Sequence, residues 1–140
     1  MPSNDGAEAE KAFIERIMSQ PNCWVERIRD AKDLRGINRG RAVGDFAKPS
    51  DFLVTQAGRL EYAEVKSTQN PRRFSFSQIE AAQKSAALKQ AAINGPYNFY
   101  IFSYGTSKWY IMPCLTYAAA LSHGDVSIKL EDLREWHLPT

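Results

Sequence analysis

The sequence has few of the residues on which cysteine- and histidine-based sites depend: two cysteines and two histidines among 140 residues. Cys23 and Cys114 lie far apart and form no CxxC motif, so we expect two free thiols rather than a disulfide framework. His123 and His137 lie near the C-terminus without ligand-like neighbours. A zinc site or a histidine-centred nuclease is therefore not expected.

Long apolar runs and a strong net charge are also absent. No run approaches the ~20 apolar residues of a membrane span, and the first residues, MPSNDGAEAEKAF, lack a basic-then-apolar signal pattern, so we expect a cytoplasmic protein. With 18 basic and 16 acidic residues the net charge is only +2, so any nucleic-acid signal must come from the distribution of charge. The length fits one domain, residues 1–140. Within it, we expect residues 1–5 to be disordered.

Hydrophobic periodicity and capping signals predict a mixture of helices and strands. A first helix is expected from about Gly6 to Ser19, with Asp5 as its N-cap and Pro21 at its end. The stretch CWVERIRDAK is ambiguous by periodicity and fits a strand that frays into polar residues. Further elements are expected at 51–55 and 60–67 (strands), 77–94 (a helix N-capped by Ser77), 97–104 and 108–113 (strands), 114–122 (a helix), and 126–136 (an extended piece with a helical turn). The order α-β-β-β-α-β-β-α predicts an α/β fold with helices on a mixed sheet.

Two of the expected strands form a hairpin across PSDFLVTQAGRLEYAEVKST. If the turn centres on Ala57 and Gly58, Asp51 opposes Glu64 across the ladder, where opposed side chains lie ~5 Å apart at Cβ. Lys66 lies two residues beyond Glu64 and therefore projects from the same face. The hairpin thus gathers two carboxylates and an ammonium within otherwise apolar surroundings.

This group of charges has a chemical use. Opposed carboxylates repel each other and are costly to bury, and a divalent cation removes that cost. Mg²⁺, with Mn²⁺ as a substitute, prefers one or two carboxylates plus water and phosphate oxygens. Lys66 would supply positive charge to the transition state of a phosphodiester, or position the attacking water. The alternative is a surface hairpin with solvated charges.

The first helix offers a third carboxylate. Phe13, Ile14, Ile17 and Met18 form its apolar stripe, and at ~100° per residue Glu10 falls within that stripe. A carboxylate aimed at the core needs a partner, so Glu10 is a candidate to complete the metal site. The alternative is a glutamate that reaches water near the start of a helix and interacts with the helix dipole.

The motifs resemble those of a known family. Asp51 followed by EVK resembles the PD-(D/E)XK nuclease superfamily. The order KPSDF, GRLEYAEVKST, FSFSQIEAAQ, YNFYIFSY, WYIMP and VSIKLEDL, over roughly residues 49–133, resembles the RecU-type Holliday-junction resolvases. This resemblance implies a restriction-endonuclease-like fold, magnesium-dependent hydrolysis and a homodimer that acts on four-way DNA junctions.

The resemblance also implies roles for particular residues. Asp51 and Glu64 would be metal ligands, Lys66 the catalytic lysine and Glu10 the helical carboxylate that some members use. Gln83 would be the glutamine on the helix after the lysine strand. A glutamine there can bond an inward polar group or a phosphate, and the alternative is a surface glutamine on a good helix. The chain lacks the long stalk insertion of cellular RecU and has alanine where a histidine often precedes this glutamine, as in a compact, phage-type member.

Two arginine-containing loops flank the predicted site. LRGINRGRAVG has three glycines and Arg35, Arg39 and Arg41, whereas QNPRRFSFSQ has Arg72 and Arg73. Glycines let backbone N–H groups approach phosphates and arginines neutralise them, so we expect both loops to bind DNA. The alternative is that these arginines are merely solvated.

The aromatic strands favour a buried core over a base-stacking surface. Two symmetric cuts in a junction would require two sites, which a two-fold dimer supplies. Tyr100, Phe102, Trp109 and Tyr117 are candidates for its interface.

The leading hypothesis is a magnesium-dependent endodeoxyribonuclease that nicks branched DNA. One alternative is a nuclease of the same fold that acts on flap, duplex, repair or restriction substrates. Another is a catalytically silent DNA-binding module.

Overall fold

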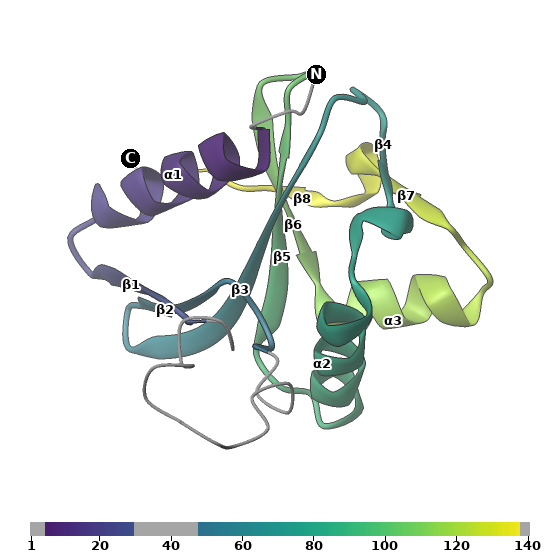
Figure 1. The fold of residues 1–140 in the computed structure, drawn as a ribbon, viewed down its shortest axis with the longest axis horizontal. Helices are drawn as coiled ribbons and strands as arrows, with labels where there is room; N and C mark the ends of the chain where they lie inside the picture. Colours follow the sequence, from purple (N-terminus) through teal and green to yellow (C-terminus); the bar gives the residue numbers. More distant parts are fainter. Residues whose placement is uncertain (1–4, 30–47, 138–140) are drawn as a thin grey trace, which may run out of the picture.

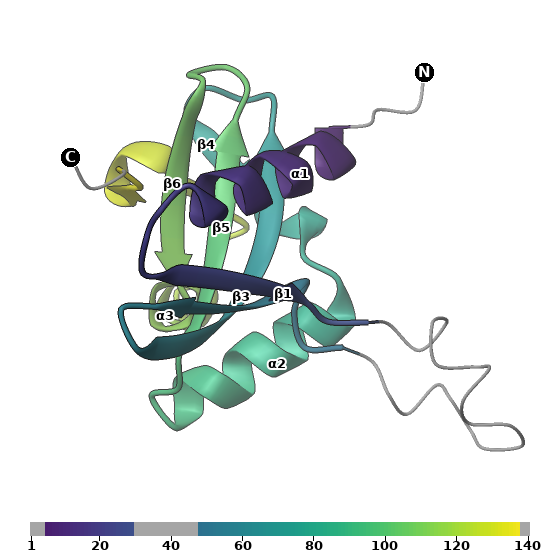
Figure 2. The ribbon, with the colours of Figure 1, turned by 90° about the vertical axis from the view of Figure 1, so that its left-hand side faces the viewer.

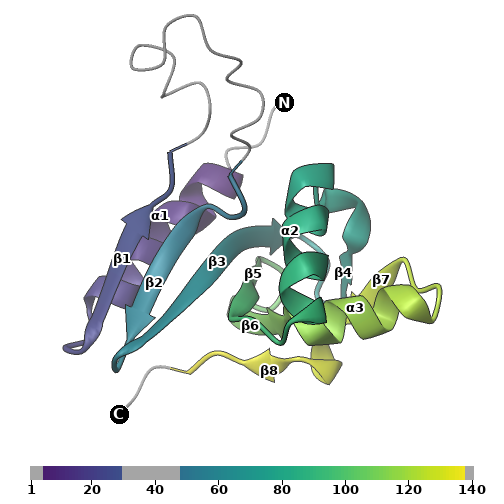
Figure 3. The same ribbon diagram turned by 90° about the horizontal axis from the view of Figure 1, so that it is seen from below.

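The computed structural model describes residues 5–29 and 48–137. Its centre is a six-stranded mixed sheet in the order β1-β2-β3-β5-β6-β8, visible in Figure 3. The strands are β1 (Cys23–Arg27), β2 (Phe52–Gln56), β3 (Arg59–Thr68), β5 (Tyr97–Ser103), β6 (Lys108–Pro113) and β8 (Arg134–Glu135). Only β3 and β5 are parallel among these neighbours. A second, two-stranded sheet pairs β4 (Arg73–Ser75) with β7 (Ser127–Lys129).

Helices cover both faces of the large sheet (Figure 1). Helix α1 (Asp5–Met18) lies across one face, as Figure 2 shows, and α2 (Ala81–Ala92) and α3 (Cys114–Ser122) lie on the other. Short 3₁₀ turns, η2 (Phe76–Gln78) and η3 (Leu130–Asp132), complete the described elements. Each face has its own apolar core, one centred on Phe13 under α1 and one on Phe99 and Tyr117 under α2 and α3. The predicted class, a mixed sheet flanked by helices, is thereby confirmed.

The predicted hairpin register is confirmed. Phe52 opposes Ala63, and Gln56 opposes Arg59 at the turn. Ala57 has a φ of 49° and Gly58 a φ of 80°, and positive φ at both central residues is what a two-residue hairpin turn requires. Strand β3 therefore presents alternate residues to its two faces. Ala63 and Val65 pack under α1, and Glu64 points to the opposite side.

Several predicted boundaries were wrong. Helix α2 begins at Ala81 with Glu80 as its N-cap, whereas Ser77 lies in η2. A 3₁₀ turn forms at Ser77 in place of the predicted helix start. Ser75 caps this turn, because its side-chain oxygen accepts a hydrogen bond from the Ser77 N–H. Asp5 is already helical rather than part of a lead. Strands β4 and β8 were not predicted, because three- and two-residue strands leave no periodic pattern.

The described residues settle three smaller predictions. Cys23 and Cys114 are free thiols, as expected. Tyr100, Trp109 and Tyr117 are buried inside the chain, so they are wrong as interface candidates. None of the described helices combines the length and apolar character needed to cross a membrane.

One glycine is required by a close approach near the end of β3. A Cβ added to Gly105, in the β5–β6 turn, would lie 2.8 Å from the carbonyl oxygen of Gln69 and 2.8 Å from the nitrogen of Pro71. We expect Gly105→Ala to lower the free energy of unfolding by about 2 kcal/mol, since the overpacked backbone must move. Urea unfolding measures this. Gly6→Ala, whose Cβ meets nothing within 4 Å, is the matched control, and equal effects of the two changes would contradict the packing argument.

Candidate active site

A cavity of about 500 Å³ lies where the end of β3 meets the N-terminal turns of α1 and α2. Its lining includes the five residues predicted as catalytic or metal-binding: Glu10, Asp51, Glu64, Lys66 and Gln83. These residues come from two helices, one strand and the segment that leads into β2. The fold therefore brings together side chains that are far apart in the sequence.

The side chains of Asp51 and Glu64 each accept a hydrogen bond from the backbone of the opposite strand segment. The Asp51 N–H donates to Glu64 Oε1 at 3.0 Å, and Asp51 Oδ2 accepts from the Val65 N–H at 3.1 Å. These bonds extend the hairpin ladder by side chains, one residue beyond the start of β2. Asp51 thus lies opposite Glu64, as the register predicted.

Each carboxylate also has a lysine beside it. Lys66 Nζ lies 3.5 Å from Glu64 Oε2, and Lys48 Nζ lies 3.5 Å from Asp51 Oδ1. The Glu64 side chain is only 2% exposed and that of Lys66 is 13% exposed. The site thus holds two carboxyl groups and two amino groups whose side chains are mostly buried, and charges interact more strongly there than in water.

The protonation of Glu64 reflects this setting. Burial, followed by the nearby charge of Asp51, raises the pKa of Glu64 to about 8, and Lys66 opposes the rise. Without a further cation, the folded protein therefore favours the protonated form of this carboxyl group near neutral pH.

Gln83 connects α2 to the carboxylates. Its side-chain Nε2 donates to Glu64 Oε2 at 2.8 Å, while its Oε1 accepts from the Glu80 N–H at 3.0 Å as part of a capping box. The amide orientation is fixed at both ends. Gln83 therefore bonds an inward polar group and is not simply a surface glutamine.

Glu10 reaches the cavity but has another partner. Its Oε1 is paired with Arg27 Nη1 at 2.8 Å, and its side chain is 26% exposed. Among residues 5–29 and 48–137, no three histidine, cysteine or acidic side chains are gathered so that they could hold a metal ion. The carboxylate pair is therefore the centre of the site, and Glu10 lies at its margin.

Of the five arginines predicted to bind DNA, two lie within the described residues. Arg35, Arg39 and Arg41 lie outside the described residues. Arg72 and Arg73 are exposed and line a cavity together with Lys129 and Glu131, separate from the active-site cavity. Arg73 is in β4, so this part of the expected loop is a strand.

Two contributors were missed by the sequence reasoning. Lys48 lies three residues before Asp51, a spacing that could have identified it. The hydroxyl of the buried Tyr97 donates to the carbonyl of Pro49, two residues before Asp51. No sequence signal points to Tyr97, because the contact depends on the parallel pairing of β3 with β5.

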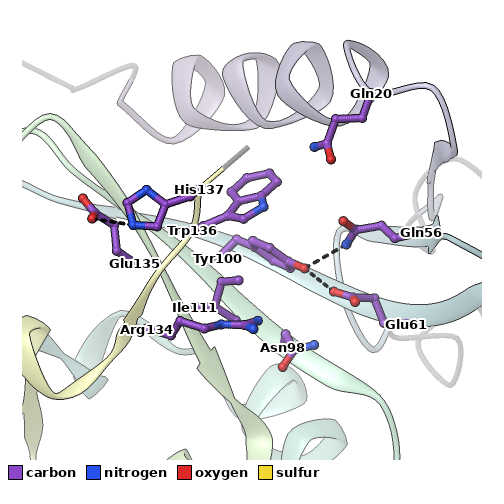
Figure 4. Close-up of a pocket in the computed structure, with 10 residues that line it drawn as sticks. All are labelled: Gln20, Gln56, Glu61, Asn98, Tyr100, Ile111, Arg134, Glu135, Trp136 and His137. Carbon is purple, nitrogen blue, oxygen red and sulfur yellow. Dashed lines mark hydrogen bonds and ion pairs between the residues drawn. The ribbon is translucent and has the colours of Figure 1, made fainter. Parts of the chain in front are cut away.

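A second polar cavity, of about 440 Å³, lies on the α1 side of the sheet (Figure 4). There the Tyr100 hydroxyl donates to Glu61 and accepts from Gln56, and burial raises the pKa of Glu61. Since Glu61 and Glu64 are three residues apart on β3, they face opposite sides of the sheet. The two cavities are therefore separate.

Comparison with known proteins supports the fold alone. No family model matches the sequence, and no curated protein matches it. The solved structure of Hjc, a Holliday junction resolvase of the archaeal hyperthermophile Archaeoglobus fulgidus, is similar with a TM-score of 0.50 at 10% sequence identity. The match covers 79% of this chain and 74% of that one. The chain thus shares its α/β architecture with that solved structure, and a RecU-type relationship stays a prediction.

Proposed function

We propose that this protein is a magnesium-dependent endodeoxyribonuclease of the Holliday-junction resolvase type, which hydrolyses phosphodiesters in branched DNA. The observation that carries the proposal is the pair formed by Asp51 and the buried Glu64, with Lys66 3.5 Å from Glu64, at an open cavity. The likeness of the fold to a solved resolvase and the order of motifs resembling RecU both favour it.

The carboxylate pair is suited to a divalent cation. Burial, and then the neighbouring charge of Asp51, raise the pKa of Glu64, so negative charge is poorly stabilised there, and a dication would offset this. Asp51 and Glu64 would hold the ion, with Glu10 as a candidate third ligand if Arg27 releases it. When bound, Mg²⁺ or Mn²⁺ supplies positive charge for the phosphate and acidifies a water molecule.

The remaining site residues would act either on the substrate or on the metal-binding carboxylate Glu64. Lys66 would orient the attacking water and stabilise the negative charge that grows on the phosphate. Gln83 holds one oxygen of Glu64 in place by its amide bond. Arg72 and Arg73, together with Arg35, Arg39 and Arg41 from the preceding segment, would neutralise DNA phosphates.

A homodimer acting on a four-way junction follows from the same chemistry. One site makes one cut, and resolution of a junction needs two symmetric cuts.

The substrate class is tested by incubating the protein and Mg²⁺ with a labelled four-way junction, a flap and the component duplexes. Paired symmetric nicks in the junction alone are expected. Equal cutting of the duplexes would remove the junction assignment, and cutting of the flap alone would favour a repair nuclease.

Tyr97→Phe is expected to impair the site without unfolding the protein. Loss of the hydroxyl leaves the Pro49 carbonyl without its donor and loosens the approach to Asp51. We expect a stability loss of about 1 kcal/mol and a several-fold higher Mg²⁺ concentration for half-maximal cleavage.

Tyr100→Phe is the matched control for this change. It removes a buried hydroxyl from the same strand, but one that serves Glu61 on the opposite face (Figure 4). Its stability should fall similarly while its Mg²⁺ requirement stays that of wild type. A parallel shift of the Mg²⁺ requirement in both variants would contradict a positioning role for Tyr97.

A further inference from the structure

Strands β4 and β7 form a ribbon, Arg73–Ser75 paired with Ser127–Lys129, beyond the end of β3 (Figure 1). In its register, Arg73 lies directly opposite Lys129. Like charges at opposed positions destabilise a strand pair. The ribbon therefore places two cations side by side at some cost to the fold.

The two faces of this ribbon differ in character. Phe74 is fully buried, and its partner Ile128 packs against the same core. The outward face consists of Arg73, Lys129 and the serine pair opposed at the other end. Cations and hydroxyls on one exposed face are groups that donate hydrogen bonds to phosphate oxygens.

Hydrogen bonds to neighbouring residues fix the positions of Arg72 and Arg73. Arg73 Nε donates to Ser127 Oγ at 2.8 Å across the ribbon. The side-chain oxygen of Asn70 accepts from the backbone N–H groups of both Arg72 and Arg73, at 2.8 and 3.0 Å. The carbonyl of Arg72 accepts from the Leu130 N–H, which ties this loop to the end of β7. The positions of the arginines are therefore set by the backbone.

These cations are not neutralised within the described chain. None of the ion pairs formed among residues 5–29 and 48–137 includes Arg72, Arg73 or Lys129. Two acidic residues are nearby: Glu131 lines the cavity shared by the three cations, and Asp125 lines a neighbouring cavity with Arg73. Neither carboxylate is paired with them, so the cations are available to an external anion.

The ribbon adjoins the active site. Thr68, at the end of β3, lines both the active-site cavity and the cavity that contains Arg73. A polyanion whose scissile phosphate lay at Glu64 and Lys66 could therefore continue along β3 toward the ribbon.

We propose that the β4–β7 ribbon is a phosphate-binding surface, in which Lys129 joins Arg73 and Arg72 in holding the DNA backbone beside the cleaved phosphodiester. The inference rests on the proposed nuclease function and adds Lys129 and a strand-borne surface to it. Because contacts of this kind carry no sequence information, the ribbon contributes affinity and register rather than base preference.

The test is binding of a fluorescent four-way junction to the full chain in chelator, measured by anisotropy over a series of salt concentrations. Lys129→Gln should make the plot of log affinity against log salt shallower by about one, because one phosphate contact is lost. Lys129→Glu should weaken binding further. It should also raise the melting temperature, because it places an opposite charge across from Arg73.

Lys89→Gln removes the same charge from the last turn of α2, at an exposed residue that lines neither cavity of the ribbon, and should leave the slope unchanged. Opposite signs for binding and stability in Lys129→Glu exclude misfolding as the cause. A wild-type slope in both Lys129 variants would overturn the ribbon proposal and leave the nuclease proposal standing. Failure of the wild-type protein to bind the junction would overturn both.

Discussion

Replacing Glu64 with glutamine should abolish DNA cleavage and, in chelator, stabilise the fold. The carboxylate is the most buried group of the site, bonded by the Asp51 N–H and by Gln83. Glutamine keeps the shape but lacks the charge that a cation needs. We expect cleavage of a junction to fall at least about 1,000-fold, equivalent to ~4 kcal/mol of transition-state stabilisation. DNA binding should be retained.

The stability effect has the opposite sign and depends on pH. Because the folded-state pKa of Glu64 is raised to about 8 from 4.5, the folded protein binds the extra proton between these values. The stability contribution of Glu64 is full below pH 4.5 and is lost as pH rises through 8. Glutamine has no such loss, so Glu64→Gln should gain stability relative to wild type as pH rises through 8.

Thermal unfolding in chelator between pH 5 and 9, beside a cleavage assay, measures both effects. Glu61→Gln is the control for cleavage, since Glu61 is a half-buried carboxylate on the same strand but faces the other cavity (Figure 4). Its cleavage should match wild type. Full activity in Glu64→Gln, or a stability difference from wild type that does not change between pH 5 and 9, would contradict the account of this site.

Removing the second carboxylate should eliminate the response of the protein to magnesium. In wild type, ion binding to the folded state alone stabilises it by about 2.7 kcal/mol at one hundred times the dissociation constant, or roughly 5 to 10 °C for a chain of this size. Asp51→Asn leaves the Val65 N–H an oxygen to bond but halves the charge of the pair. We expect neither a Mg²⁺-induced shift in melting temperature nor cleavage.

Calorimetric titration of Mg²⁺ and melting with and without the ion test this directly. Glu61→Gln should respond to Mg²⁺ as wild type does, because its carboxylate lies on the far side of the sheet. Undiminished Mg²⁺ binding in Asp51→Asn would show that the ion binds elsewhere. No Mg²⁺ binding by wild type would favour a catalytically silent DNA-binding module.

The centre of the site could be predicted because it depends on local geometry. The turn at Ala57–Gly58 sets the register of the hairpin, and the register alone places Asp51 opposite Glu64. Lys66 then follows from the two-residue period of a strand. No contact between distant parts of the chain was needed for this inference.

The surroundings of the site could not be predicted, because they depend on distant pairings. Tyr97 reaches Pro49 only after β5 has paired with β3. Glu10 lines the cavity, but its ion pair with Arg27 requires β1 to lie beside α1.

The start of α2 illustrates a local ambiguity. Ser77 and Glu80 both precede an alanine-rich helix, and a serine is the commoner N-cap. Ser77 lies inside the 3₁₀ turn Phe76–Gln78, which Ser75 caps, so the helix begins after Glu80 instead. This shift matters for the site, because it makes Gln83 the third residue of the helix, where it can bond both Glu80 and Glu64.

The most direct test of the central claim is cleavage of a labelled four-way junction by wild type and Glu64→Gln, each with magnesium and with chelator. We predict nicks in the wild-type reaction with magnesium and in none of the other three. Nicks that persist in chelator, or in Glu64→Gln with magnesium, would mean that the Asp51–Glu64 pair is not where the phosphodiester is hydrolysed.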